Sequence, residues 1–309
     1  MTQSKHYKIA IIGSGPAGLS AALYTARADL KPILFSGMLL HGQVSQTHLI
    51  ENYPGFPDGI SGMELGQLFQ KQAERFGADI EFDQVESVDL QVKPFKICTY
   101  SQDYLADAVI ISTGADPKKL NIPGEKEYTG RGVSYCATCD GWFYKDKDVV
   151  LVGGGDSALE EGLFLTRFVK SVSIIHRRDK LRAGAILENR AKSNPKIKFV
   201  WNSIVTEING EVSVNSVTIK NVVSGEEIIE KTDGIFIFIG HRPNSTMFQG
   251  QLEIDDLGYI KIDQKMQASI PGVFAAGEIA DPIYRQVVTS AGMGAAAGMQ
   301  AIHYLESIE

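Results

Sequence analysis

One local pattern occurs twice in the chain and limits its fold more than any other feature. An apolar run at 9–12 leads into the glycine turn GSGPAG, and an apolar run at 149–152 leads into GGGDSALE. Segments of helical composition follow both turns, so each copy predicts a strand, a tight turn and a helix. The copies begin at Gly13 and Gly153, an offset of 140 residues. Solenoids repeat roughly every 20 to 50 residues, so this spacing favours two dinucleotide-binding α/β domains.

The last third of the chain lacks the pattern of a third domain. It offers two short strand candidates, at 259–262 and 272–276, and then one helix. Such strands need another sheet to join, so we expect this segment to return to the first domain. Proline and glycine mark the predicted crossings near 117–124 and 240–245. We therefore predict two Rossmann-like domains, the second inserted into a discontinuous first, with these boundaries: 1–117 with 245–309, and 118–244.

Length and charge agree with two domains and exclude some functions. A chain of 309 residues exceeds what one hydrophobic core usually fills. The formal net charge is -7 and no block of like charge occurs, which makes nucleic acid and anionic membranes poor partners. No apolar run approaches the roughly 20 residues of a membrane helix, and the N-terminus lacks the features of a signal peptide. We expect a soluble, cytoplasmic protein.

The first glycine turn fits the G-x-G-x-x-G fingerprint of dinucleotide binding. Gly13 would make the tight turn, Gly15 would allow a pyrophosphate to approach, and Gly18 would let the helix pack closely. A structural turn in an ordinary α/β domain is the alternative, but the flanking strand and helix favour a nucleotide. The next strand, 32–35, ends at Ser36 and Gly37 without the usual ribose-binding acid. The ribose must therefore be held in another way.

The second turn fits G-x-G-x-x-A, and its next strand, 172–175, ends in HRRDKLRA. Three arginines stand where an acid would select NAD, and arginine pairs well with a 2′-phosphate. NADPH is therefore predicted over NADH; a solvated basic helix end is the alternative. The residues assigned to NADPH are Gly153, Gly155, Asp156, Ser157, His176, Arg177, Arg178 and Arg182.

Between the turns lies CATCD, a C-x-x-C pair followed by an acid. Such a pair is either redox-active or half of a zinc site, and zinc normally needs four ligands. No second C-x-x-C or H-x-x-x-H occurs, so we predict a redox pair, Cys136 and Cys139, and no metal. Asp140 could protonate a thiolate, with a solvated surface aspartate as the alternative. Cys98 lies in the alternating segment FKICTY and is expected to be a buried strand residue without a function.

Reduction of a disulfide by NADPH requires a hydride to become a pair of thiolates. A flavin performs that conversion, because it accepts hydride and passes electrons to a disulfide sulfur. The first glycine turn has no nicotinamide-specific feature, and it is therefore assigned to FAD.

Four segments together, CATCDG, HRRDKLRA, GVFAAGE and YRQVVTSAG, closely resemble the low-molecular-weight thioredoxin reductases, and the likeness covers essentially the whole chain. The resemblance implies a homodimeric, cytoplasmic enzyme with thioredoxin as its protein substrate. It also implies that Cys139 faces the flavin and that Cys136 attacks the thioredoxin disulfide. The residues it assigns to FAD are Gly13, Ser14, Gly15, Pro16, Ala17, Gly37, Gly42, Gln43, Asn52, Thr113, Gly114, Gly277, Glu278, Arg285, Gln286 and Val287.

The sequence departs from this family at Glu278, where the family usually has an aspartate that contacts the ribityl chain of the flavin. The extra methylene shifts the carboxylate. Arg285 to Val287 would begin the last helix, whose positive end would face the pyrimidine edge of the flavin.

Other functions agree less well with these motifs. A dithiol oxidase that dispenses with NADPH would not need HRRDKLRA, and a flavin ferredoxin reductase of this architecture would lack the cysteine pair. A nucleotide-sensing module would leave the pair idle. A related small redox protein could replace thioredoxin as the acceptor.

The positions of the reactive groups imply motion. The cysteine pair and the NADPH turn lie in the inserted domain, whereas the flavin belongs to the other domain. Nicotinamide and disulfide must each reach the flavin, and Cys136 must also reach an external disulfide. We therefore expect the inserted domain to rotate between half-reactions.

Overall fold

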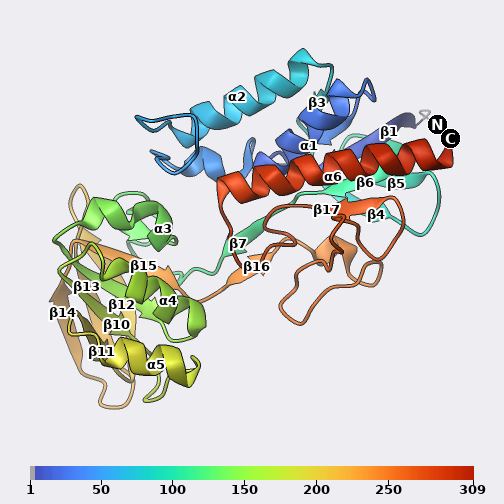
Figure 1. Cartoon of the computed structure of the whole chain (residues 1–309). Coiled ribbons are helices and arrows are strands. Elements are labelled where there is room, and N and C mark those ends of the chain that lie inside the picture. Colours follow the sequence, from blue (N-terminus) through green and yellow to red (C-terminus); the bar gives the residue numbers. More distant parts are fainter. Residues whose placement is uncertain (1–3) are drawn as a thin grey trace. The chain divides into compact units, whose positions relative to one another are not determined.

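The computed structural model describes residues 4–309 of the chain. They form two compact units (Figure 1). The first unit combines the chain up to Asp116 with Arg242–Glu309, and the second comprises Pro117–His241. The chain thus changes unit after residues 116 and 241, whereas the sequence indicated changes after 117 and 244. Among residues 4–309, no helix is long and apolar enough to cross a membrane.

A seven-stranded sheet is the centre of the first unit. Its order is β3-β2-β1-β6-β5-β4, with β17 also paired to β6; the pairs are parallel except for β4–β5 and β5–β6, which are antiparallel. The bounds are β1 (Lys5–Ile12), β2 (Ile33–Phe35), β3 (Asp79–Glu81), β4 (Val85–Asp89), β5 (Phe95–Thr99), β6 (Asp103–Ile111) and β17 (Val273–Ala275).

The last third of the chain joins this sheet through β17, which is the strand expected at 272–276. The other expected strand, 259–262, is wrong: Ile260 makes only an isolated bridge with Ile254. Cys98 lies on β5 as expected, but it is half-buried and not fully buried.

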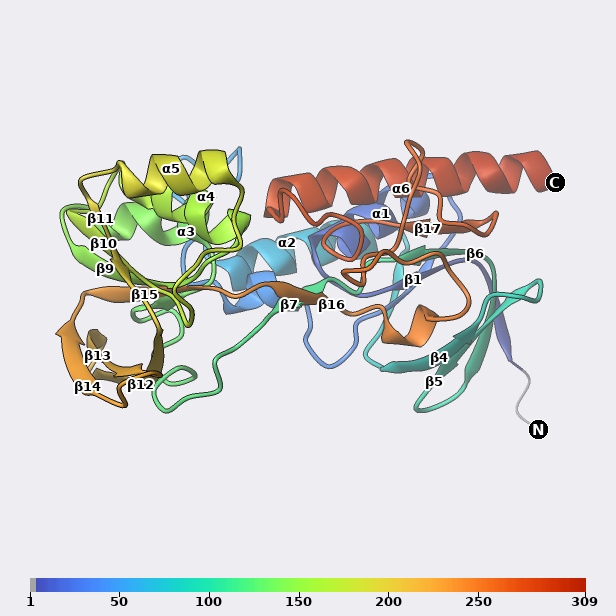
Figure 2. The same cartoon turned by 90° about the horizontal axis from the view of Figure 1, so that it is seen from below.

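Helices cover one face of the first sheet (Figure 2). They are α1 (Pro16–Arg27), α2 (Gly62–Arg75) and α6 (Val287–Ile308). Two short 3-10 turns, η1 (Gly42–Gln46) and η3 (Thr246–Phe248), also belong to this unit, and Phe248 of η3 packs on the opposite face of the sheet. Side chains of β1 alternate between two cores, as a strand buried on both faces requires. Ile9 and Ile11 pack with α1 and α6, and Ala10 and Ile12 pack on the opposite face. A Cβ on Gly294 of α6 would lie 2.0 Å from the Ala17 carbonyl oxygen, so glycine allows these helices to touch.

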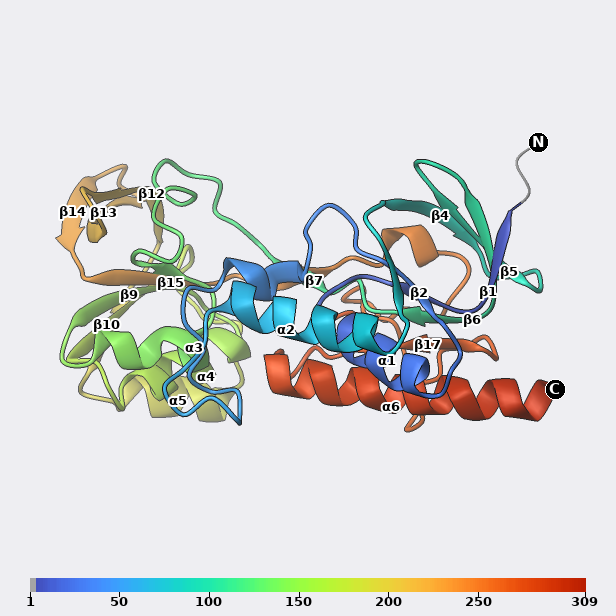
Figure 3. The same ribbon diagram turned by 90° about the horizontal axis from the view of Figure 1, so that it is seen from above.

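The second unit has a five-stranded parallel sheet of order β11-β10-β9-β15-β8. Helices cover one face, and the antiparallel sheet β12-β13-β14 covers the other (Figure 3). The strands are β8 (Val133–Ser134), β9 (Asp148–Gly153), β10 (Ser171–Ile175), β11 (Ile197–Val200), β12 (Ser203–Gly210), β13 (Val214–Asn221), β14 (Glu227–Lys231) and β15 (Gly234–Phe238). The helices are α3 (Ala137–Asp140), α4 (Asp156–Leu165) and α5 (Ala185–Lys192), with the 3-10 turn η2 (Gly141–Tyr144).

The two crossings between the units run as short strands. These are β7 (Ala115–Pro117) and β16 (His241–Pro243), and they pair with each other as a two-stranded sheet.

Candidate active site

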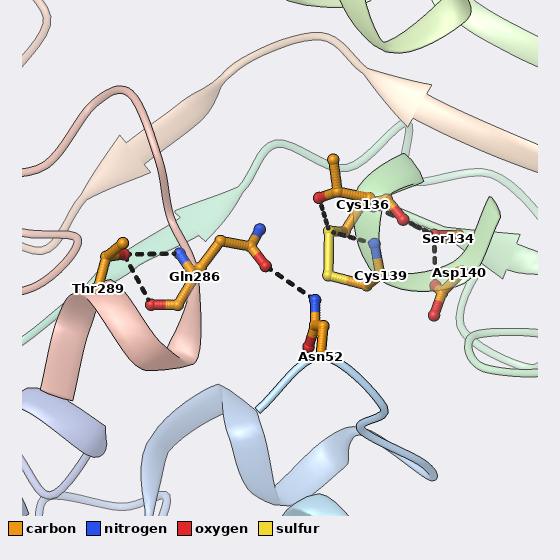
Figure 4. Close-up of a disulfide and its surroundings, with 8 residues drawn as sticks. Asn52, Ser134, Cys136, Cys139, Asp140, Gln286 and Thr289 are labelled. Atoms are coloured by element: carbon orange, nitrogen blue, oxygen red, sulfur yellow. Dashed lines mark hydrogen bonds between the residues drawn. A yellow bond between two sulfur atoms is a disulfide. The ribbon is translucent and has the colours of Figure 1, made fainter. Parts of the chain in front are cut away.

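The predicted redox pair forms a disulfide in the structure. Cys136 and Cys139 are joined, with their Cα atoms 5.3 Å apart. Cys136 is the N-cap residue of α3, and the backbone N–H of Cys139 donates a hydrogen bond to Cys136 Sγ at 3.2 Å (Figure 4). Thiolate is the reactive form of cysteine, and a donor at this position stabilises negative charge on the reduced Cys136 sulfur.

Asp140 ends α3 and is half-buried, unlike the solvated aspartate that was the alternative. Burial raises its pKa above the usual range, while a hydrogen bond from the Ser134 hydroxyl to Asp140 Oδ2, 2.6 Å long, acts in the opposite direction. A carboxyl group in this environment keeps its proton to a higher pH than a surface aspartate does. Asp140 is therefore suited to donate a proton to a thiolate.

The first glycine turn has the conformation that its fingerprint predicts. Gly13 has φ +110°, and a Cβ there would lie 2.3 Å from the Ser112 carbonyl oxygen. A Cβ on Gly18 would lie 1.9 Å from the Gly13 carbonyl oxygen. Gly15 differs, because a Cβ there would meet nothing within 4 Å, and no side chain caps α1 at this residue. Open space therefore adjoins the uncapped N–H groups of a helix, which suits a pyrophosphate.

The second turn repeats this arrangement at the N-terminus of α4. Gly155 is its N-cap, with no side-chain cap and with open space where a Cβ would be, whereas a Cβ on Gly153 would lie 2.6 Å from the Phe238 carbonyl oxygen. His176 is buried and its Nδ1 lies 3.0 Å from the Gly153 carbonyl oxygen, so this ring supports the turn. Asp156 accepts the Gly184 N–H at 2.8 Å.

The arginines lie beside the second turn, where the parallel strand β10 ends. The Arg182 N–H donates to the Gly154 carbonyl oxygen at 2.8 Å. The side chains of Arg177, Arg178 and Arg182 are exposed, and none forms an ion pair with another residue among 4–309. Three exposed guanidinium groups that form no such ion pair, next to the open N-terminus of α4, fit a phosphate ligand.

The residues assigned to FAD come from distant segments of the first unit and contact one another. A Cβ on Gly42 would lie 3.1 Å from Gly15 Cα, and Ser14 Oγ accepts the His41 N–H at 3.0 Å. The Asn52 amide donates to Gln286 Oε1 at 3.1 Å (Figure 4). Two further hydrogen bonds join Gln43 Nε2 to the Ala115 carbonyl oxygen at 2.5 Å and Thr113 Oγ1 to the Asn244 carbonyl oxygen at 2.9 Å.

Glu278 is half-buried, and its carboxyl group makes no hydrogen bond to any residue among 4–309. Burial raises the pKa of Glu278 to about 7; Arg285 lowers it, whereas Asp281 and Asp116 raise it further. A carboxyl group that makes no hydrogen bond to these residues, close to the glycine turn at Gly277, fits a site completed by a polar ligand.

Two residues of these sites have no counterpart in the sequence analysis. Ser134 bonds to Asp140 from β8, and no local pattern marks it. Buried Asp281 accepts the N–H groups of Ile283, Tyr284 and Arg285 at 2.9, 2.9 and 3.1 Å, and so holds Arg285 at φ +49°. The turn-forming preference of aspartate before Pro282 could have indicated it.

Among residues 4–309, no group of three or more His, Cys, Asp or Glu side chains could hold a metal ion.

Comparisons with known proteins agree with this chemistry. The family model described as pyridine nucleotide-disulphide oxidoreductase matches residues 7–294. Thioredoxin reductase of Mycolicibacterium smegmatis is 46% identical over 305 residues, 98% of either chain. That of Bacillus subtilis is 46% identical over 311 residues, which cover 100% of this chain and 98% of the relative.

Comparison with solved structures also finds a thioredoxin reductase. The crystal structure of thioredoxin reductase from Streptococcus pyogenes matches with a TM-score of 0.94 and 43% identity, covering 99% of this chain and 100% of that one. An α/β fold, a glycine turn for each of two nucleotides and a redox disulfide define a flavin- and nicotinamide-dependent disulfide oxidoreductase. The chain belongs to the pyridine nucleotide-disulphide oxidoreductase family and, within it, to the thioredoxin reductases.

Proposed function

We propose that the protein is an NADPH-dependent thioredoxin-disulfide reductase that uses FAD. The observation that carries the proposal is the Cys136–Cys139 disulfide, with an N–H bonded to one sulfur and the half-buried acid Asp140 beside it. The related thioredoxin reductases, similar over nearly the whole chain, support thioredoxin as the acceptor. A different small redox protein is the alternative.

FAD is assigned to the first unit and NADPH to the second. The open N-terminus of α1, the half-buried Glu278 carboxyl and the Asn52–Gln286 pair support the first assignment. The open N-terminus of α4 and the exposed arginines support the second, and the 2′-phosphate is their expected ligand. Bound flavin would supply the conversion of a hydride into electrons for the disulfide.

The cysteine pair and Asp140 carry out the disulfide exchange. Cys136 thiolate attacks a substrate sulfur; the substrate disulfide breaks, and a mixed disulfide with Cys136 forms. Cys139 thiolate then attacks the Cys136 sulfur, which restores the Cys136–Cys139 disulfide and releases the second substrate thiolate. Two electrons pass from the enzyme dithiol to the substrate, and Asp140 donates a proton to a departing thiolate.

We also propose a cytoplasmic homodimer, as the family resemblance implies. Exposed apolar side chains on α1 and α6 support an interface there, among them Tyr24 at 38% and Met299 at 43% exposure. Sedimentation equilibrium would measure the assembly.

The test of the function is NADPH oxidation by the purified protein with and without thioredoxin from the same source. Stimulation that saturates with thioredoxin is expected. If NADPH is oxidised equally fast without thioredoxin, with oxygen as the electron acceptor, the result would instead support a dithiol oxidase.

A further inference from the structure

Ser134 links the catalytic acid to the redox pair. It is only 3% exposed and lies at the end of β8, two residues before Cys136. Its Oγ lies 2.6 Å from Asp140 Oδ2 and 3.1 Å from the Cys136 backbone nitrogen (Figure 4). One hydroxyl group therefore contacts both the acid and the backbone of the first cysteine.

The directions of these bonds follow from the donors available. The Cys136 N–H can only donate, so Ser134 Oγ accepts that bond. The Ser134 proton then has two acceptors: Asp140 Oδ2 at 2.6 Å and the Cys136 carbonyl oxygen at 3.2 Å. The shorter distance and the charge of an ionised carboxylate both favour Asp140.

We propose that Ser134 is a positioning residue for disulfide exchange: it fixes the Asp140 carboxyl group beside the cysteines and stabilises the carboxylate that forms when Asp140 gives up its proton. This inference rests on the proposed role of Asp140 as a proton donor.

The chemical step shows why the hydroxyl group matters. The leaving sulfur takes the Asp140 proton together with the electron pair of the broken S–S bond, so a thiol and a carboxylate result. Burial opposes the carboxylate, and the Ser134 bond is the contact that favours it. Without this bond, Asp140 holds its proton more tightly and its carboxyl group is free to turn away.

Other ionisable groups near Asp140 do not obscure its titration. Tyr144 interacts electrostatically with Asp140, but burial, Asp140 and Asp233 raise its pKa to about 12. The cysteines are disulfide-bonded in the oxidised protein and titrate only after reduction. Their contribution is identified by comparison with Asp140→Asn, which keeps both thiols and removes the acid.

The experiment measures the pH dependence of thioredoxin reduction by the holoenzyme carrying Ser134→Ala, Ser134→Thr or Asp140→Asn. Ser203→Ala is the matched control, because Ser203 is also 3% exposed in the second unit and its hydroxyl group donates to the Trp201 carbonyl oxygen at 2.8 Å, away from the redox pair. Thermal unfolding and NADPH reduction of the flavin, a step that does not use the acid, verify that each variant is folded.

Ser134→Ala should slow thioredoxin reduction about 10-fold at its best pH, part of the roughly 100- to 10,000-fold that a positioned acid contributes. The fall in rate at high pH should begin at a higher pH than in the wild type, because loss of the bond raises the pKa of Asp140. Ser134→Thr should restore the wild-type profile, and Ser203→Ala should match the wild type.

Two results would overturn separate parts of this account. If Ser134→Ala keeps the wild-type profile while Asp140→Asn loses the high-pH limb, the inference about Ser134 is wrong and the acid role stands. If Asp140→Asn also keeps the wild-type profile, the acid role itself is wrong.

Discussion

Burial raises the pKa of Glu278, and we therefore expect the stability of the folded chain to depend on pH through this residue. Its pKa rises from 4.5 to about 7 in the folded chain, so the folded state binds a proton more tightly than the unfolded state. Stability should therefore be greatest below pH 4.5 as far as this residue is concerned, and should fall as pH rises toward 7.

Glu278→Gln should remove this dependence, because glutamine does not titrate. Denaturant unfolding of the flavin-free protein between pH 5 and about 8 measures it. Exposed Glu253→Gln is the control and should leave the slope unchanged. An unchanged slope in Glu278→Gln would show that Glu278 is ionised throughout this range.

Among single residues, the sequence predicted those site residues whose partners are close along the chain. The C-x-x-C pair and Asp140 lie within five positions, and each glycine turn within six. Ser134 was missed for a physical reason: its role depends on a hydrogen bond made after the backbone has folded, and no distinctive spacing marks it. Asp281 bonds only two to four residues along the chain, so its turn preference before Pro282 was a usable local signal.

Among the elements, the strand–turn–helix units were predictable because their glycines obey local steric rules. Gly13 needs a positive φ and Gly18 admits no Cβ, so the fingerprint itself specifies the turn. The sheet β12-β13-β14 was not predicted, because its pairing depends on packing against the β9 side chains Val150 and Val152. The false strand at 259–262 similarly has apolar residues but no neighbouring strand to pair with.

The end of β10 carries the prediction for nucleotide choice. Changing Arg177, Arg178 and Arg182 together to glutamine should raise the KM for NADPH far more than that for NADH. Charge-assisted contacts are worth about 1.5 to 3 kcal/mol each, so the loss should be at least about 10-fold. Steady-state kinetics with both nucleotides measures it. Arg190→Gln on α5 is the control. Equal losses for NADPH and NADH would show that the cluster does not bind the 2′-phosphate.

For the whole molecule, rotation of the second unit is the principal hypothesis. The crossings pair as β7 and β16, which gives two adjacent connections about which a unit can turn. A cross-link that holds the units in one arrangement should stop turnover with thioredoxin, while one half-reaction persists. Stopped-flow spectroscopy of the flavin distinguishes the half-reactions. A locked enzyme that turns over at the normal rate would exclude rotation.

The central claim is that electrons pass from NADPH through the flavin to the Cys136–Cys139 disulfide and then to thioredoxin. Its most direct test follows flavin absorbance and thioredoxin reduction together in the single variants Cys136→Ser and Cys139→Ser, with Cys98→Ser as the control. We predict that NADPH still bleaches the flavin in both variants, that thioredoxin reduction is lost, and that Cys98→Ser behaves like the wild type. Normal thioredoxin reduction in either Cys136→Ser or Cys139→Ser would contradict the account.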